Sequence, residues 1–262
     1  TTFLVLSYLN VTCLEQVQRH QTKTNKNNEG KGMWSASTVN NKLTGRPVFD
    51  YRSLRFAMGC VALSLSFVVM AIAQVPLSSI SISYYTPARD VFVGSLFVVG
   101  SFLIAYNGRY VHEAILSKIA GIAALVIALE PTSCLVATDP QVCANVTAMG
   151  HPKIHAIAAL THFAILAYFC LGPFREQAKQ KNHHKATRRI VLYTLCGWTI
   201  ITAIAAALLA GFGYITMPRI VFYAETAALC AFGIAWIVSG HTFSFFTHDD
   251  ERWNLFRGRV GK

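Results

Sequence analysis

The sequence predicts an all-α protein, a polytopic bundle of six transmembrane helices with both termini in the cytoplasm. Its composition indicates a membrane protein, because only 13% of the 262 residues are charged and 53% are hydrophobic. A soluble domain carries about 25% charged residues. Long apolar runs recur along the chain, and a spanning helix needs roughly 20 such residues. The distribution of Lys and Arg between the connecting segments gives the orientation.

The apolar runs define six expected spans, and prolines mark their ends. The third span is the weakest, because Lys118 lies one turn inside it and must extend toward the interface. Pro76, Pro131 and Pro173 follow helices, where a helix would be interrupted. Other prolines open helices, where proline is tolerated. We expect the spans at residues 55–75, 91–108, 112–130, 154–172, 190–211 and 220–240.

Lys and Arg are divided very unequally between the two sides of this bundle. Twenty fall in the N-terminal segment, the turn after the second span, the loop after the fourth span and the C-terminus. The other side has three, which are Arg89, Lys153 and Arg219. Positive residues stay in the cytoplasm, so we expect a multi-pass protein of an inner or plasma membrane. The net charge of +11 is then an orientation signal, and we expect no nucleic-acid partner.

Three regions differ in composition. Residues 1–47 are mostly polar and expected to be disordered; the first 32 precede Met33 and are either disordered or lie upstream of the natural start. Residues 48–242 form the transmembrane domain, and residues 243–262 form a basic cytoplasmic tail. The long outer loop holds Cys134 and Cys143, for which we expect a disulfide, since that compartment is oxidising. It also holds a glycosylation sequon at Asn145.

Ionisable residues at membrane depth are costly, so each one is a candidate site residue. His155 and His162 are seven residues apart, which puts them on one helix face with His162 about 10 Å deeper. Glu225 lies about 9 Å below the start of its helix, at the expected level of His162. Together with Asp90 and Glu130, they predict a polar pocket that opens outward.

The stretch "SSISISYYTPARDVF", residues 78–92, is predicted to form the rim of this pocket. Its serines, Ser79 and Ser81 among them, and the pair Tyr84 and Tyr85 lie above the ionisable groups, and Arg89 is placed to contact a ligand. Local structure offers an alternative interpretation. Thr86 and Pro87 suit the start of a helix, and an aspartate in the first turn suits its dipole.

The ionisable groups have structural alternatives too. Glu130 fits a helix end at the interface, His155 a hydrated position, and a hydrogen bond between His162 and Glu225 would satisfy both groups. Metal binding is a further alternative, because "HPKIH" places His151 and His155 four residues apart. The glutamate of H-E-x-x-H is missing, and P-loop and G-x-S-x-G motifs are also missing. Catalytic residues, metal ligands and cofactors therefore stay unassigned.

Four stretches carry a family resemblance: "FDYRSLRFAMG", "SISISYYTPARDVFVGSLFVVGSFLIAYNGR", "IAGIAALVIALEPT" and "AETAALCAFGIAWIVSG". Over most of residues 48–240, the chain resembles a group of small bacterial six-helix integral membrane proteins with no established reaction. It is more distantly similar to DRAM-like membrane proteins, which also have a Ser-Ile-Ser element after the first helix. Their aspartate directly after that element is replaced here by Ser83 and Tyr84. The resemblance implies the six-helix layout and no activity.

The leading functional expectation is an outward-facing pocket that binds a small molecule or a lipid headgroup. Asp90, His155, His162 and Glu225 would supply charge and exchange protons, with Tyr84, Tyr85 and Arg89 at the rim. One alternative is a membrane-embedded metal-dependent lipid hydrolase. Another is a structural or partner-binding protein, whose polar groups tie helices together. The lipid bilayer is a partner in every case.

Overall fold

The structure, a computed structural model, describes residues 51–144, 151–180, 184–241, 246, 253–254 and 258–259. All of them belong to the unit Val48–Lys262. The predicted N-terminal segment 1–47, most of the predicted tail 243–262 and the sequon at Asn145 lie outside the described residues.

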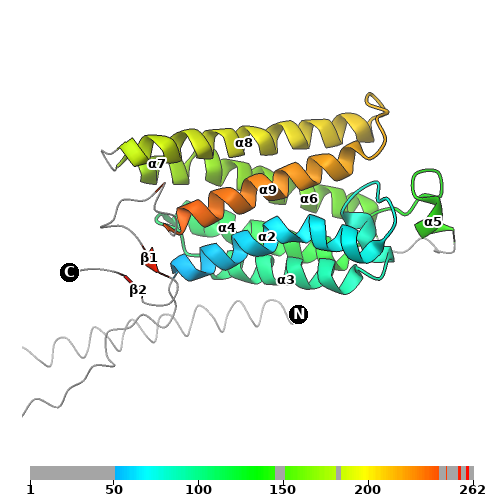
Figure 1. Cartoon of the computed structure of the whole chain (residues 1–262), viewed down its shortest axis with the longest axis horizontal. Helices are drawn as coiled ribbons and strands as arrows, with labels where there is room; N and C mark the ends of the chain where they lie inside the picture. Colours follow the sequence, from blue (N-terminus) through cyan, green and yellow to red (C-terminus); the bar gives the residue numbers. More distant parts are fainter. Residues whose placement is uncertain are drawn as a thin grey trace, which may run out of the picture. The chain divides into compact units, whose positions relative to one another are not determined.

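The described chain is helical, apart from one pair of antiparallel two-residue strands, β1 and β2 (Figure 1). The prediction of an all-α fold is confirmed. Each expected span overlaps one long helix, and their ends agree to within a few residues except at the start of α8. The elements are α2 (Tyr51–Ala73), the 3-10 helix η1 (Ser81–Tyr85), α3 (Arg89–Ala105), α4 (Val111–Leu129), α5 (Pro140–Cys143), α6 (Pro152–Leu171), α7 (Pro173–Lys179), α8 (His184–Gly211), α9 (Ile220–Ser239), β1 (Trp253–Asn254) and β2 (Gly258–Arg259).

Five helical stretches are long and apolar enough to cross a membrane, which supports a multi-pass membrane protein. They are Arg52–Ala73, Val111–Leu129, Pro152–Lys179, His184–Gly211 and Ile220–Ser239. The remaining expected span corresponds to α3, which has 17 residues.

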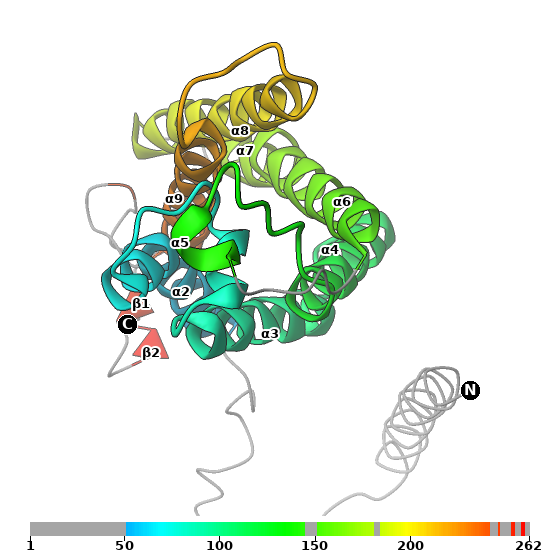
Figure 2. The same ribbon diagram turned by 90° about the vertical axis from the view of Figure 1, so that its right-hand side faces the viewer.

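The six long helices form a closed ring when viewed along their length (Figure 2). Contacts connect α2 to α3, α3 to α4, α4 to α6, α6 to α8, α8 to α9 and α9 back to α2. At one end of this ring lie η1, α5 and the first residues of α6 and α9, and we call this the η1 end. The opposite end, where α7 lies, is called the α7 end.

Hydrogen bonds hold each end of the ring together. At the α7 end, Arg55 of α2 donates to the Ser239 carbonyl of α9 and to the Tyr106 hydroxyl after α3. At the η1 end, the Phe222 N–H of α9 donates to the Ser78 carbonyl before η1. Lys118 donates to the side chain of Asn107, so its ammonium extends toward the α7 end as the sequence requires.

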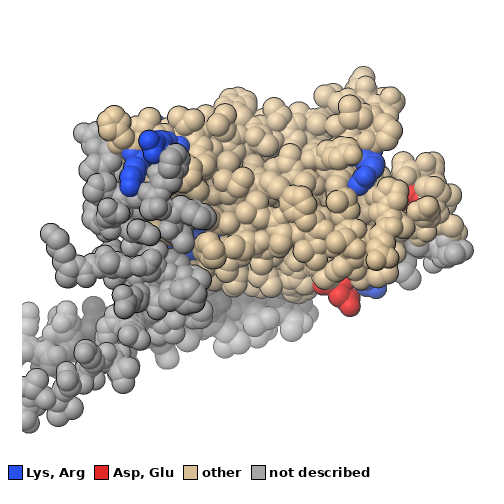
Figure 3. Space-filling model, viewed as in Figure 1, with Lys and Arg blue, Asp and Glu red and all other residues tan. Residues whose placement is uncertain are grey.

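Charged side chains avoid the middle of the described bundle. On the face shown in Figure 3, Lys and Arg lie near the two ends, and the described surface between them carries no charged side chain. Large apolar side chains are exposed in that region instead; Phe67 of α2 is 57% exposed and Leu195 of α8 is 64% exposed. Such a belt is expected when lipid is the solvent.

Candidate functional site

The serine-rich stretch before α3 forms the 3-10 helix η1, which packs into one end of the bundle. Ile80 and Ile82 alternate with serines, and both isoleucines are buried, which anchors this short segment. The Ser83 N–H donates to the Ile80 carbonyl, and the Ile82 N–H donates to the Ser79 hydroxyl oxygen. The isoleucines of this pattern therefore pack into the core, and the Ser79 hydroxyl bonds to the backbone of the same turn.

The loop between α4 and α6 closes over η1. Its predicted disulfide between Cys134 and Cys143 is confirmed, with an S–S distance of 1.99 Å. Asp139, which is buried inside this loop, accepts hydrogen bonds from the Ser78 N–H at 2.8 Å and the Ser78 hydroxyl at 2.5 Å. Tyr85 donates its hydroxyl hydrogen to the Thr132 carbonyl at 2.7 Å. These bonds fix η1 between the outer loop and the helices.

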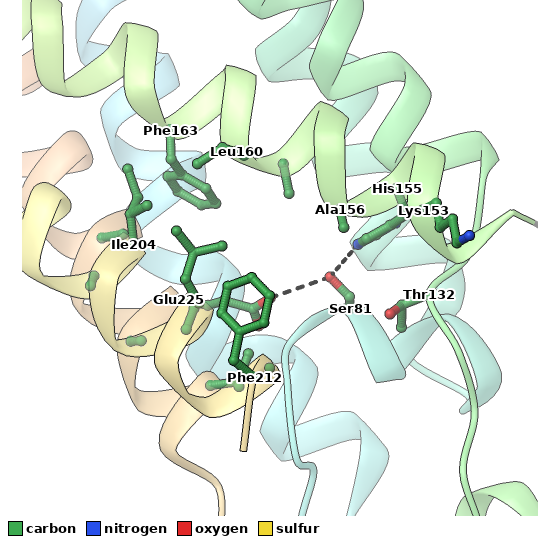
Figure 4. Close-up of a pocket in the computed structure, with 18 residues that line it drawn as sticks. Ser81, Thr132, Lys153, His155, Ala156, Leu160, Phe163, Ile204, Phe212 and Glu225 are labelled. Atoms are coloured by element: carbon green, nitrogen blue, oxygen red, sulfur yellow. Dashed lines mark hydrogen bonds between the residues drawn. The ribbon is translucent and has the colours of Figure 1, made fainter. Parts of the chain in front are cut away.

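A line of polar side chains connects α9, η1 and α6 (Figure 4). One oxygen of Glu225 accepts the Ile80 N–H at 2.5 Å, and the other lies 3.5 Å from the Ser81 hydroxyl. That hydroxyl lies 3.0 Å from Nε2 of His155. On the opposite side of the imidazole, Nδ1 of His155 lies 2.7 Å from the backbone carbonyl of Glu130.

These distances determine the direction of the hydrogen bonds around His155. A carbonyl only accepts, so Nδ1 carries a hydrogen and donates it to Glu130. In the neutral ring Nε2 is then an acceptor. Two acceptors compete for the single hydroxyl hydrogen of Ser81, Nε2 at 3.0 Å and the Glu225 carboxylate at 3.5 Å, and the shorter distance favours Nε2. The side chain is 5% exposed, so this arrangement is buried inside the protein.

A large pocket adjoins this line of polar groups, between α6, α8 and α9. Its volume is about 680 Å³, within the usual range of about 300–1,000 Å³ for ligand pockets. Most of its wall is alanine, leucine, isoleucine, valine, glycine and phenylalanine. Its polar lining consists of Ser81, Thr132, Lys153, His155 and Glu225. Figure 4 shows Ser81, Thr132 and His155 together toward one end, and Phe163 and Ile204 toward the other.

A second cavity, of about 40 Å³, lies deeper in the bundle and is lined by His162, Glu225 and Ser81 among apolar residues. His162 is 2% exposed, and its Nδ1 lies 2.9 Å from the Ala120 carbonyl of α4. Both histidines therefore reach carbonyls on or next to α4, as their seven-residue spacing requires. Glu225 bonds to η1, and no direct hydrogen bond joins it to His162 among the described residues. The cavity is large enough for a water molecule between the two polar groups.

Four predicted site residues, the rim residues Tyr84, Tyr85 and Arg89 and the charged residue Asp90, lie away from the pocket wall. Tyr84 accepts a hydrogen bond from Arg89 at 2.8 Å, and the guanidinium also lies over the tyrosine ring at 4.3 Å. Tyr85 bonds to the outer loop. Asp90 is exposed in the first turn of α3. None of the four belongs to the lining of the large pocket, and the helix-start interpretation accounts for Asp90 by itself.

Glu130 contributes to the site through its backbone. Its carboxylate turns outward and pairs with His151 at 3.0 Å. The hydrogen bond from His151 lowers the pKa of Glu130 below its ordinary value of 4.5. Its carbonyl points inward to His155. The inward carbonyl follows from the break in α4 just before Pro131, which frees the last carbonyls of the helix from bonds within it.

Two pocket residues escaped sequence reasoning, Lys153 and Thr132. In the sequence Lys153 is one of three basic residues on its side of the membrane, and nothing distinguishes Thr132. Ser81 is predicted at the rim, but its contact with His155 is not. The signals were present, a lysine in the first turn of an apolar helix and a serine between buried isoleucines, but only packing brings them together.

Among the described residues, no group of three or more His, Cys, Asp and Glu side chains is placed to hold a metal ion. Comparisons of the chain with protein-family models, with curated proteins and with solved structures return no match.

Proposed function

We propose that this protein is a six-span membrane protein that holds an amphipathic molecule of the lipid class in the pocket between α6, α8 and α9. The distribution of polarity in the pocket carries this proposal. Hydroxyl, imidazole and carboxylate groups gather toward η1, the Lys153 ammonium lies farther out at the same end, and the rest of the wall is apolar. A molecule with one polar end and a hydrocarbon part matches both regions.

In this proposal α3 is the sixth span. Its 17 residues give about 25 Å of helix at 1.5 Å per residue, the lower end of what spans a hydrocarbon core of about 30 Å. Its neighbours α2 and α4 flank it within the ring. Six spans place both termini on one side, and the excess of Lys and Arg assigns that side to the cytoplasm. The η1 end then faces outward, in an inner or plasma membrane.

In this proposal a hydrocarbon chain reaches the pocket between α6 and α8. Leu160 of α6 and Leu208 of α8 both line the pocket, and they are 42% and 44% exposed. Phe212, at the end of α8, lines it too and is 75% exposed. A hydrocarbon chain passing between α6 and α8 would remain in an apolar environment throughout.

The polar end of the pocket offers groups for a headgroup. Ser81, Thr132 and His155 are close to one another in Figure 4, and the ammonium of Lys153 lies farther out. Lys153 is exposed in the first turn of α6, where it would attract an anionic group. His155 keeps one nitrogen directed at Ser81, so a ligand must either share that hydrogen bond or replace it.

Photochemical labelling tests the proposal on the full chain in detergent or nanodiscs. The probe is a lysophospholipid with a diazirine in its acyl chain, and labelled peptides are identified by mass spectrometry. We expect adducts in α6, α8 and α9 at pocket positions. Ala207→Phe fills the pocket from α8 and should reduce this labelling at least several-fold.

Ala205→Phe is the matched control, because this residue lies on the same helix, is exposed and does not line the pocket. Labelling that stays unchanged in Ala207→Phe, or that falls equally in both variants, contradicts the proposal. The metal-dependent lipid hydrolase and the structural or partner-binding role stay predictions from the sequence.

A further inference from the structure

We propose that Ser81 and His155 form a nucleophile and general base that cleave the acyl ester bond of an amphipathic substrate held in the large pocket. This inference rests on the proposed lipid-binding function and adds a reaction to it. Two observations support the inference. Ser81 contacts His155, which contacts the Glu130 carbonyl, and both Ser81 and His155 line the mostly apolar pocket.

The hydrogen-bond geometry is that of an activated serine. Nucleophile and base lie within hydrogen-bond reach when 2.6–3.2 Å separate them, and the distance from the Ser81 hydroxyl to Nε2 is 3.0 Å. A third group must hold the base in the correct tautomer. The carbonyl of Glu130 does so at 2.7 Å, since it requires hydrogen on Nδ1 and leaves Nε2 free to accept the serine proton.

The neighbouring hydroxyls of Ser79, Ser83 and Thr86 lack such a base, and the Ser78 hydroxyl donates to the Asp139 carboxylate, which does not line the large pocket. The Ser79 oxygen accepts the Ile82 N–H, and the Thr86 hydroxyl donates to the Ser83 carbonyl. The Ser83 hydroxyl is buried and has no hydrogen-bond partner among the described residues. Of the hydroxyls of Ser78, Ser79, Ser81, Ser83 and Thr86, only that of Ser81 belongs to a residue that lines the large pocket. The difference between adjacent serines follows from the turn of η1, which directs Ser81 toward α6 and α9.

The pocket would present an ester to this pair. With the acyl chain along the apolar wall near Phe163 and Ile204, the carbonyl carbon comes to the polar end, where Ser81 lies. Thr132 lies beside Ser81 in Figure 4, and its hydroxyl is a donor that could stabilise the developing oxyanion. The Glu225 carboxylate, 3.5 Å from the Ser81 hydroxyl, favours the imidazolium that forms on His155.

The reaction proceeds in two balanced steps. The Ser81 oxygen bonds to the acyl carbon while its proton moves to Nε2 of His155; the bond to the leaving alcohol then breaks, and the alcohol takes that proton. In the second step water attacks the acyl-serine and gives its proton to His155. The acyl–Ser81 bond breaks, the serine oxygen regains the proton, and a fatty acid leaves. Water is the only co-reactant, and no redox change occurs.

Covalent labelling with dodecyl fluorophosphonate tests the inference. This reagent phosphonylates serines that a neighbouring base activates, and its alkyl chain suits the apolar wall. The full chain in nanodiscs should gain one adduct on the peptide that contains Ser81. Ser81→Ala should abolish it, and His155→Gln should slow it by about 10²–10⁴-fold, the usual contribution of a general base. Ser83→Ala removes an unpaired hydroxyl nearby and should react like the unmodified protein.

The diazirine lysophospholipid is applied to the same samples, which separates the two proposals. Pocket labelling without phosphonylation of Ser81 overturns the nucleophile and leaves lipid binding in place. Loss of both signals in the unmodified protein overturns both. His155→Gln must keep its pocket labelling, so that its slow phosphonylation reports lost activation rather than lost folding. Phosphonylation that proceeds equally fast in His155→Gln also overturns the proposed pair.

Discussion

The contact between α3 and α4 provides a sharp test of packing, because two glycines face each other across it. A Cβ added to Gly121 would lie 2.6 Å from the Gly100 carbonyl oxygen, and one added to Gly100 would lie 2.9 Å from the Gly121 oxygen. Ordinary contacts begin at 3.4 Å. Both obstacles are backbone atoms, so no side chain can rotate away, and the two helices must separate.

The magnitude follows from two opposing effects. Alanine is favoured over glycine inside a helix by about 0.5–1 kcal/mol. Overpacking a close contact typically costs about 1–3 kcal/mol. We therefore expect Gly121→Ala to lower the free energy of unfolding by about 1–2 kcal/mol, or a few degrees in Tm for a chain of this size. Helix propensity by itself predicts the opposite sign.

Gly94 is the matched control, because it lies in the same helix as Gly100 and nothing comes within 4 Å of an added Cβ. Gly94→Ala should be neutral or stabilising. The buried thiols of Cys170 and Cys196 report unfolding through their reaction with a fluorogenic maleimide during heating, with Cys13, the exposed Cys60 and the half-buried Cys230 replaced by serine beforehand. A Gly121→Ala protein that is as stable as Gly94→Ala would refute the packing argument.

Two further predictions concern the outer loop. Asp139→Ala removes the acceptor of the Ser78 N–H and hydroxyl, and a hydrogen bond to a charged group is worth about 1.5–3 kcal/mol. Hydrogen exchange at the Ser78 amide should therefore accelerate roughly tenfold to a hundredfold; unchanged exchange would show that the loop is held elsewhere. His151→Ala should raise the pKa of Glu130 toward its ordinary value, since His151 lowers it. The stability that this exposed pair contributes is present above pH 4.5 and declines as the pH falls through the lowered pKa of Glu130. The variant should therefore lose less stability on acidification than the unmodified protein. Thermal unfolding measured across pH 3–6 checks this.

Local chemistry made much of the fold predictable. The lengths of the apolar runs gave the six long helices, and Pro131 and Pro152 marked boundaries that the structure reproduces. The disulfide was predictable too, because Cys134 and Cys143 are nine residues apart in one loop and oxidation needs only that they meet. These features depend on residues that are neighbours in the chain, so a single sequence contains the relevant information.

The sequence predicted how deep the candidate site lies in the membrane, but not which residues line it. Counting residues along helices placed His155, His162 and Glu225 near the η1 end, and they do line the two cavities found there. The same count also placed Asp90 at the depth of the pocket, yet Asp90 is exposed on α3. Depth follows from the rise per residue, whereas the direction of a side chain depends on how each helix is rotated about its axis.

The sequence by itself therefore determined which segments are helices, which of their residues lie at the same depth, and how positive charge divides between the ends. The tertiary structure decided that the hydroxyl of Ser81 meets Nε2 of His155 and that a pocket opens between α6, α8 and α9. Ser81, Glu130, His155 and Glu225 come from four separate segments of the chain. Their meeting depends on the order of helices in the ring and on the inward fold of η1, which arise from packing between distant residues.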